Sequence, residues 1–352
     1  PAFATHRAHL DSMAAPSSAA TASSAEAASD PWPHFGTPKN KPIVCIIVGM
    51  AGTGKTTFMQ RLAAHVGEKK IPSYFINLDP AVTKIPYKPH VDIRESLNYK
   101  QVMKQYNLGP NGGIMTSLNL FATRFDQLMT ILEKRTPNLK YIFIDTPGQI
   151  EVFNWSASGT IITDTLASSF PTTFVYVADT PRCVSPNTFM SNMLYACSIL
   201  YKARLPLILA FNKVDVTPHD FAEEWMKDSQ AFDEACRTGG NYMANLTQSM
   251  GLMLQEFYEH LTTVGVSART GIGMDTFFEK TLVAIKEYET EYLPELLRRI
   301  TLKQEKEAER QREQLTKVVE DIKSTGGVKV VTAEKQERKH NLGDTLVPND
   351  DS

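Results

Sequence analysis

A glycine-rich loop of sequence GMAGTGKT, at residues 49–56, constrains the fold of this chain more than any other feature. It matches the pattern GxxxxGK[ST], follows the apolar run at 42–48, and precedes a stretch whose apolar residues have helical spacing. In such a strand–loop–helix context the glycines let several backbone N–H groups converge on one phosphate, and the helix N-terminus adds partial positive charge. An accidental match is expected in roughly one chain of this length in a hundred. The loop therefore predicts a nucleotide phosphate site.

The polar residues of this loop have distinct expected roles. Lys55 should reach the β- and γ-phosphates, and the Thr56 hydroxyl should bind Mg²⁺. The full set expected around the phosphates is Gly49, Gly52, Thr53, Gly54, Lys55, Thr56 and Thr57. A nucleoside triphosphate with Mg²⁺ is thus the expected ligand.

Short apolar runs recur along the chain between longer amphipathic stretches. Five of them predict buried parallel strands, at 42–48, 73–78, 141–145, 174–179 and 207–212, and a weaker sixth lies at 263–268. Continuous rather than alternating apolar runs are typical of strands that are covered on both faces. The alternation predicts an α/β fold of the P-loop NTPase type, with a doubly wound, mostly parallel sheet and a helical insertion. Ligands of such sheets bind at the carboxyl ends of the strands.

The sequence DTPGQ at 145–149 directly follows the third predicted strand. Asp145 at a strand end can hold Mg²⁺ through its water shell. The N–H of Gly148 can approach the γ-phosphate, and Gln149 can orient an attacking water. A plain Pro-Gly turn is the alternative, but the glycine-rich loop upstream favours a γ-phosphate sensor.

A base-reading motif is predicted by Asn212-Lys213-Val214-Asp215, which follows the fifth run. The Asp215 carboxylate can accept hydrogen bonds from guanine N1–H and N2–H₂, a donor pair that adenine lacks. The stem of Lys213 can cover the base, and Asn212 can tie loops together. Ser267-Ala268 resembles the fifth GTPase motif, and the resemblance implies that a backbone N–H there reads guanine O6. GTP or GDP is therefore the expected nucleotide.

Two further segments can each be explained as a turn. Asp79, in NLDPA at 77–81, either starts a turn or lies near the metal or the attacking water. The segment GPNGG at 109–113 would by itself be a plain turn.

The chain has a net charge of −2, which does not indicate nucleic acid or a membrane surface as the main partner. It has four cysteines without close pairing, so neither a disulfide framework nor a zinc site is expected. No stretch reaches the roughly 18 apolar residues of a membrane span.

The composition divides the chain into four parts. Residues 1–41, rich in Ala and Ser, are expected to be disordered. A nucleotide-binding domain is expected at 42–292 with a helical insertion at about 216–262, then a charged helix at 293–323 and a disordered tail at 324–352. Apolar residues recur in the insertion at helical spacing: Met243, Leu246, Met250, Met253, Phe257 and Leu261. We interpret them as a core-facing stripe, with an adaptable groove for an apolar segment as the alternative.

Taken together, GMAGTGKTT, NLDPA, GPNGG, DTPGQIE, NKVD and VSA resemble the motifs of the GPN-loop GTPases over about residues 42–290. The resemblance implies a nucleotide-bridged dimer, either a homodimer or a heterodimer with a paralogous GPN-loop GTPase. In that dimer Gly109, Pro110 and Asn111 would reach the phosphates of the other subunit, with Asn111 stabilising the transition state. It also favours Asp79 as a metal or water ligand.

The resemblance further implies a role with RNA polymerase II subunits, in assembly and nuclear import, and a cytoplasmic protein that can shuttle to the nucleus. We expect a Mg²⁺-dependent GTP hydrolase that acts as a dimeric molecular switch. The alternatives are a nucleotide-stabilised chaperone or adaptor that binds a client while its hydrolysis is incidental, and a small-molecule kinase with the same phosphate loop.

Overall fold

A computed structural model describes residues 41–237, 247, 249–251, 254, 257–258 and 261–298, together with 301–302, 305–306, 309–310, 312 and 316. The expected disordered segment, except for Lys41, and the expected tail at 324–352 lie outside these residues.

A seven-stranded sheet forms the centre of the molecule, in the order β3-β2-β4-β1-β5-β6-β7, and every neighbouring pair is parallel. The strands are β1 (Ile43–Val48), β2 (Ser73–Asn77), β3 (Val91–Asp92), β4 (Tyr141–Asp145), β5 (Thr172–Asp179), β6 (Leu207–Asn212) and β7 (Thr262–Val266). The six predicted strands are confirmed to within two residues at each end. The sequence did not predict β3, because two residues are too short for a periodicity.

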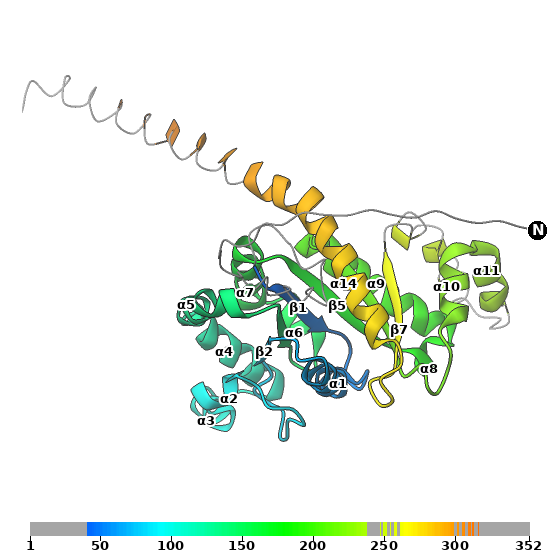
Figure 1. Cartoon of the computed structure of the whole chain (residues 1–352), viewed down its shortest axis with the longest axis horizontal. Coiled ribbons are helices and arrows are strands. Elements are labelled where there is room, and N and C mark those ends of the chain that lie inside the picture. The colour runs from blue at the N-terminus through cyan, green and yellow to red at the C-terminus, as the bar shows by residue number, and fades with distance from the viewer. Residues whose placement is uncertain are drawn as a thin grey trace, which may run out of the picture.

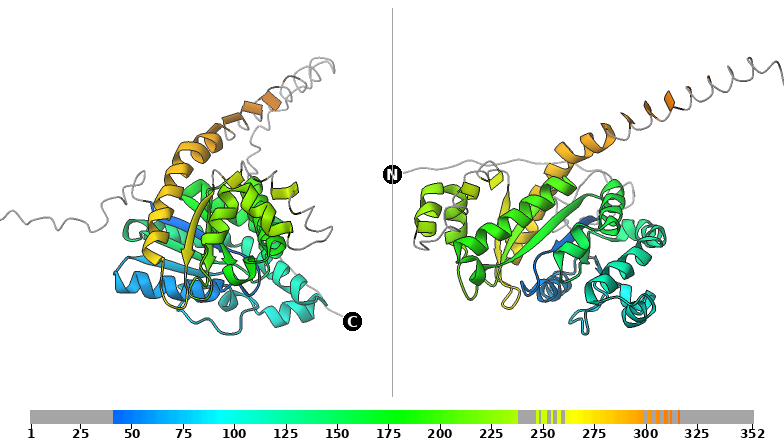
Figure 2. Two further views of the ribbon diagram at one scale, coloured as in Figure 1. Left: turned by 90° about the vertical axis from the view of Figure 1, so that its right-hand side faces the viewer. Right: turned by 180° about the vertical axis from the view of Figure 1, so that it is seen from behind.

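Helices cover both faces of this sheet. One face carries α1 (Lys55–Glu68) and α14 (Met274–Glu287). The other carries α4 (Pro110–Ala122), α5 (Phe125–Arg135), α6 (Ile150–Asn154), α7 (Ala157–Ser169) and α9 (Pro186–Ala203). In Figure 1 α14 lies in front of the sheet, and in the reverse view of Figure 2 α9 lies in front of it. The doubly wound α/β architecture is thus confirmed.

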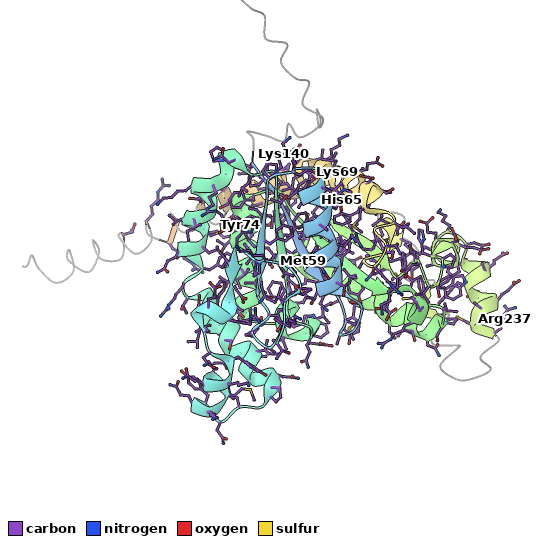
Figure 3. The ribbon with its side chains drawn as sticks, turned by 60° about the horizontal axis from the view of Figure 1, so that its bottom comes forward. Met59, His65, Lys69, Tyr74, Lys140 and Arg237 are labelled. Atoms are coloured by element: carbon purple, nitrogen blue, oxygen red, sulfur yellow. The ribbon has the colours of Figure 1, made fainter. Side chains whose placement is uncertain are left out.

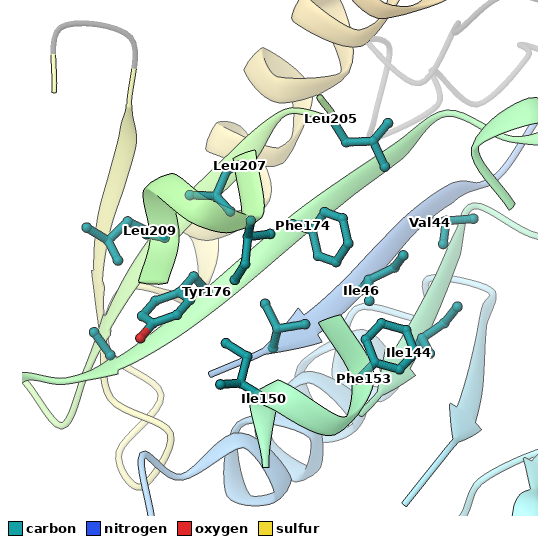
Figure 4. Packing of buried hydrophobic residues seen from close by; sticks show 14 of the residues in the cluster. Val44, Ile46, Ile144, Ile150, Phe153, Phe174, Tyr176, Leu205, Leu207 and Leu209 are labelled. Atoms are coloured by element: carbon teal, nitrogen blue, oxygen red, sulfur yellow. The ribbon is translucent and has the colours of Figure 1, made fainter. Parts of the chain in front are cut away.

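Alternate residues of β1 enter different cores. Val44 and Ile46 join the cluster that includes α7 and α9, whereas Cys45 and Ile47 join the cluster with α1 and α14. Figure 4 shows part of the first cluster, in which Val44 and Ile46 of β1 lie with Phe174 of β5 and Phe153 of α6. Because both faces of the strand are buried, its sequence is apolar without interruption.

Short elements complete the described fold. They are α2 (Ile93–Ser96), α3 (Tyr99–Gln105), η1 (Thr136–Asn138), α8 (Thr180–Cys183), α10 (Asp220–Lys227), α11 (Ser229–Arg237) and the π-helical turn η2 (Tyr288–Tyr292). The helical residues at 293–298 follow η2 without a break, so Pro294 continues a helix after a π turn rather than starting a separate one.

The expected insertion contains α10 and α11. Of its apolar stripe, Phe257 is buried in the core, and Met250 and Leu261 pack against it. Met243, Leu246 and Met253 lie outside the described residues. The three described positions therefore have the core-facing role. Across the described ranges, no helix is long and apolar enough to cross a membrane.

Candidate functional site

The predicted motifs meet at the carboxyl edge of the parallel sheet. The 49–56 loop follows β1, DTPGQ begins with Asp145 at the end of β4, and Asn212 ends β6. Adjacent strands are in register there, with Ile47 beside Asp145 and Asn212 beside Val266. Loops that are distant in sequence therefore form one continuous site.

The glycine-rich loop ends at the N-terminus of α1, which has no side-chain cap. The cap residue of α1 is Gly54, with a φ of 93° and no side-chain cap hydrogen bond. An added Cβ on Gly54 would lie 2.6 Å from Asn212 Nδ2, and one on Gly49, whose φ is 148°, would lie 2.5 Å from the carbonyl oxygen of Val177. The first amides of α1 are thus left to a ligand, and an anion is the ligand that they favour.

Lys55 is buried and folds back over this loop. Its Nζ donates to the carbonyl oxygens of Gly49 at 2.7 Å, Met50 at 2.9 Å and Gly148 at 3.4 Å. Burial lowers the pKa of Lys55 to about 8, an effect that the nearby Asp145 carboxylate opposes. The backbone carbonyls are neutral partners for the Lys55 ammonium, and a phosphate would add the negative charge that they lack.

Asp145 is the most deeply buried carboxylate of the site. Burial raises its pKa to about 7. The Tyr87 hydroxyl donates to its Oδ2 at 3.0 Å. Its Oδ1 is buried and has no hydrogen-bond partner among the described residues. An unpartnered buried carboxylate oxygen is costly unless a cation or its water shell meets it.

Asp79 lies next to the γ-phosphate sensor loop. Its Oδ2 accepts from the Gly148 N–H at 3.3 Å, and its Oδ1 accepts from the Ala81 N–H at 2.9 Å. Burial raises the pKa of Asp79. Oδ1 of Asp79 therefore stabilises the expected turn. Oδ2 connects the segment after β2 to the loop after β4. Gln149 caps the start of α6 and is half-buried.

The donor set fits a divalent cation that keeps most of its waters. Asp145 Oδ1, the half-buried Thr56 hydroxyl and a nucleotide phosphate would supply three oxygens, as Mg²⁺ prefers. No group of three or more His, Cys, Asp or Glu suited to a metal occurs in the part of the chain that the structure describes. Thr57 is exposed beside Thr56.

The Asn212 side chain connects the base-reading segment to the phosphate loop. Its Nδ2 donates to the carbonyl oxygen of Thr53 at 2.9 Å, and its Oδ1 accepts from the N–H of Lys213 and of Ala268 at 2.9 and 3.0 Å. Lys213 has a left-handed φ of 70°, and its Nζ donates to Gly52 O at 3.1 Å. Asn212 therefore has the connecting position that the sequence predicted.

Asp215 and Ser267 meet at the surface end of the site. The Ser267 hydroxyl donates to Asp215 Oδ1 at 2.7 Å and accepts from the Thr270 N–H at 3.1 Å. Asp215 itself is exposed. The N–H of Ala268, which we expected to read guanine O6, already donates to Asn212 in this arrangement.

The GPNGG segment is not a plain turn, so that alternative is wrong. Gly109 caps α4, Pro110 is its first residue, and Asn111 follows in the first turn. Tyr99 donates to the Pro110 carbonyl at 3.1 Å, and Gly113 packs closely against Met103. Asn111 is exposed. The structure thus holds this asparagine on a rigid helix start facing solvent.

Two residues that the sequence did not single out support the site. Tyr87 orients Asp145, and Asp179 ends β5 with its Oδ2 2.7 Å from Lys213 Nζ and 3.3 Å from Arg182 Nε. No local motif marks Tyr87. Asp179 does end an apolar run, which is the position where polar residues of parallel sheets gather.

A parallel sheet with a GxxxxGKT loop and an open helix N-terminus defines a P-loop nucleotide-binding protein of the α/β class. A family model described as "Conserved hypothetical ATP binding protein" matches residues 47–287. GPN-loop GTPase 1 of Dictyostelium discoideum is 56% identical, with 85% of this chain and 76% of that protein covered. GPN-loop GTPase 1 of Saccharomyces cerevisiae is 51% identical, with 80% and 75% covered. The chain belongs to the GPN-loop GTPase family.

A crystal structure of a GTPase in apo form from Pyrococcus abyssi has the same fold. It is 24% identical to this chain with a TM-score of 0.61, and the match covers 69% of this chain and 97% of that one.

Proposed function

We propose that this protein binds GTP with Mg²⁺ and hydrolyses it. The observation that carries the proposal is the convergence of Lys55, the uncapped N-terminus of α1 and the unpartnered buried oxygen of Asp145 at one edge of the sheet. These groups suit a polyphosphate and its metal, and Asp215 with its loop lies at the end where the base would bind. The names of the GTPase relatives support the same activity.

Guanine is the proposed base, although the family model is described by ATP binding. The exposed Asp215 has one carboxylate oxygen engaged by Ser267. Guanine offers the paired N1–H and N2–H₂ donors that a carboxylate can accept, whereas adenine lacks this pair and would give the carboxylate no such donors. The residues of the base site therefore favour GTP over ATP.

In the proposed mechanism the phosphates displace the backbone carbonyls from Lys55 and bind the first amides of α1. Thr56, Asp145 and, through water, Asp79 would hold Mg²⁺, whose positive charge would offset the negative charge that develops on the phosphate oxygens. The Gly148 N–H would exchange Asp79 for the γ-phosphate, and Gln149 would orient the attacking water.

The active form is proposed to be a dimer, either of two copies or with a paralogous chain. The exposed Asn111, held at the start of α4, would reach the phosphates of the other subunit and donate a hydrogen bond to developing charge. Closing the dimer would exclude water and couple nucleotide state to shape.

We propose, on the resemblance stated above, that the switch acts in the assembly and nuclear import of RNA polymerase II, in the cytoplasm with shuttling to the nucleus. The alternative, a client-binding chaperone with incidental hydrolysis, would use the apolar stripe of the insertion. The burial of Phe257 and the packing of Met250 and Leu261 argue against an open groove at those positions.

The deciding experiment measures phosphate release from GTP and from ATP over a range of protein concentrations. We expect hydrolysis of GTP alone, with a rate per molecule that rises with concentration, and its loss in Asn111→Ala. Equal use of ATP would refute the role of Asp215. A concentration-independent rate that survives in Asn111→Ala would refute the action in trans.

A second experiment separates the switch from the chaperone. Gln149→Leu should abolish hydrolysis while nucleotide binding persists, because the side chain is proposed to orient only the water. A switch would then lose its cellular function. If cellular function persists in this variant, hydrolysis is incidental, and the chaperone function replaces the switch as the proposal.

A further inference from the structure

The loop between β7 and α14, residues 267–273, is tightly folded on itself. The Ser267 N–H donates to the Ile272 carbonyl at 2.9 Å, and the Gly271 N–H donates to the Ser267 carbonyl at 2.8 Å. Gly273 has a φ of 78°, and an added Cβ there would lie 2.0 Å from Gly265 O. Asp215 and Asn212 hold this loop from the base-reading segment, at Ser267 and Ala268 respectively.

Arg61, in the second turn of α1, holds the same loop from the phosphate-binding helix. Its Nε donates to the carbonyl oxygen of Ala268 at 3.1 Å, and its Nη2 donates to the carbonyl oxygen of Arg269 at 2.5 Å. Gly271 passes directly over the guanidinium, because a Cβ at Gly271 would lie 3.5 Å from Nη1. One side chain thus binds two successive carbonyls of the loop.

The two helices on either side of this contact form a rigid pair. Phe58 and Phe277 pack edge to face with ring centroids 5.3 Å apart, and His65 stacks on Phe278 at 5.2 Å. Lys69 forms an ion pair with Asp275. Figure 3 shows Met59 and His65 along α1, with Lys69 just beyond its end. Arg61 is therefore carried on a helix that packs directly against α14.

The direction of these hydrogen bonds decides which way the loop's N–H groups point. A trans peptide has its carbonyl oxygen and its N–H on opposite sides. Because Arg61 draws the Ala268 carbonyl toward α1, the N–H of Arg269 in the same peptide points away from α1. The Ala268 N–H is already engaged by Asn212. The Arg269 N–H is thus the donor of this turn that Arg61 orients.

We infer that Arg61 is a positioning residue for base recognition, fixing the Ala268–Arg269 peptide so that its N–H meets guanine O6; this rests on the proposed guanine binding. Arg61 needs no contact with the nucleotide for this role. Because the helix that carries Arg61 also binds the phosphates at its N-terminus, the same element sets the separation between the phosphate site and the base site.

The test compares the binding of three diphosphates to Arg61→Met and to the wild-type chain. GDP and IDP both have O6, whereas 2-aminopurine riboside diphosphate lacks it. We expect Arg61→Met to weaken GDP and IDP by the same factor, about tenfold, as for the loss of one oriented hydrogen bond. The analogue without O6 should weaken less than about twofold. Gln60→Met, an exposed neighbour on the same helix, is the matched control and should change none of them.

Equal weakening of all three ligands would overturn the inference, since Arg61 would then act through α1 or the fold as a whole. No weakening of any ligand would overturn it as well. If Arg61→Met does not fold, Arg61→Lys decides, because a lysine keeps the charge but cannot donate in a fork to two carbonyls. If the wild-type chain prefers neither GDP nor IDP over the analogue, the proposed recognition of guanine itself fails. That comparison uses the wild-type chain alone, so it distinguishes the two proposals before any variant is made.

Discussion

Replacing Asp145 by asparagine should stabilise the Mg²⁺-free protein while removing its response to Mg²⁺. Burial raises the pKa of this carboxyl from its ordinary 3.8 to about 7. Between those values the folded protein retains a proton that the unfolded chain has lost. Stability therefore falls as the pH rises through this window, and the loss is complete above about pH 7.

The magnitude follows from the width of that window. About three pH units at ~1.4 kcal/mol per unit give a ceiling of ~4 kcal/mol for the gain in Asp145→Asn at pH 8. The gain is reduced because Lys55 loses a carboxylate that favours its charged form. The amide oxygen of asparagine can still accept from the Tyr87 hydroxyl. We expect about 2–4 kcal/mol at pH 8 and less than half of that at pH 5.

Urea unfolding of nucleotide-free protein in EDTA, at pH 5 and pH 8, measures this difference. Asp126→Asn, at an exposed aspartate in α5, is the control and should change stability little at either pH. Added Mg²⁺ with GDP should stabilise the wild-type chain more than Asp145→Asn. An Asp145→Asn variant that is less stable than wild type at pH 8, or a gain that does not grow with pH, would refute the reasoning.

Three other variants test separate parts of the site. Gly49→Ala should lower the free energy of unfolding by more than about 2 kcal/mol in urea titrations, because its Cβ would lie 2.5 Å from Val177 O at a φ of 148°; an unchanged midpoint would contradict this. Tyr87→Phe should lower stability by about 1–3 kcal/mol and raise the Mg²⁺ concentration needed for hydrolysis, since it leaves Asp145 Oδ2 without its donor; an unchanged Mg²⁺ titration would count against it. Asp215→Asn should weaken GDP by about a hundredfold in equilibrium binding and favour XDP, whose C2 carbonyl accepts from an amide; retained GDP preference would exclude Asp215 as the base reader.

The parallel sheet and its phosphate loop could be predicted from sequence because they depend on short-range patterns. A continuous apolar run such as 42–48 requires cover on both faces, and the loop after it has fixed positions for glycine and lysine. The same reasoning located Asp145 and Asn212, since polar residues at strand ends of a parallel sheet lie at one edge.

The supporting contacts could not be predicted, since they join segments far apart in the chain. Tyr87 reaches Asp145 from a loop 58 residues earlier, and Arg61 reaches Ala268 across 207 residues. Neither residue belongs to a motif, and both have ordinary neighbours in sequence. The segment around Pro110 does not by itself separate a turn from a helix start, because Gly, Pro and Asn favour both structures, and only the packing of Gly113 on α3 decides between them.

The register of the last strand has a consequence for how the chain folds. β7 pairs with β6 from Thr262 to Val266, so the loop that follows β7 meets Asn212 only after most of the domain exists. Contacts between such distant segments close late and slow the search for the native state. A ligand that binds only the completed edge can stabilise the finished fold but no earlier intermediate. A nucleotide that needs the 267–273 loop would therefore stabilise the nascent domain only after that loop has been synthesised.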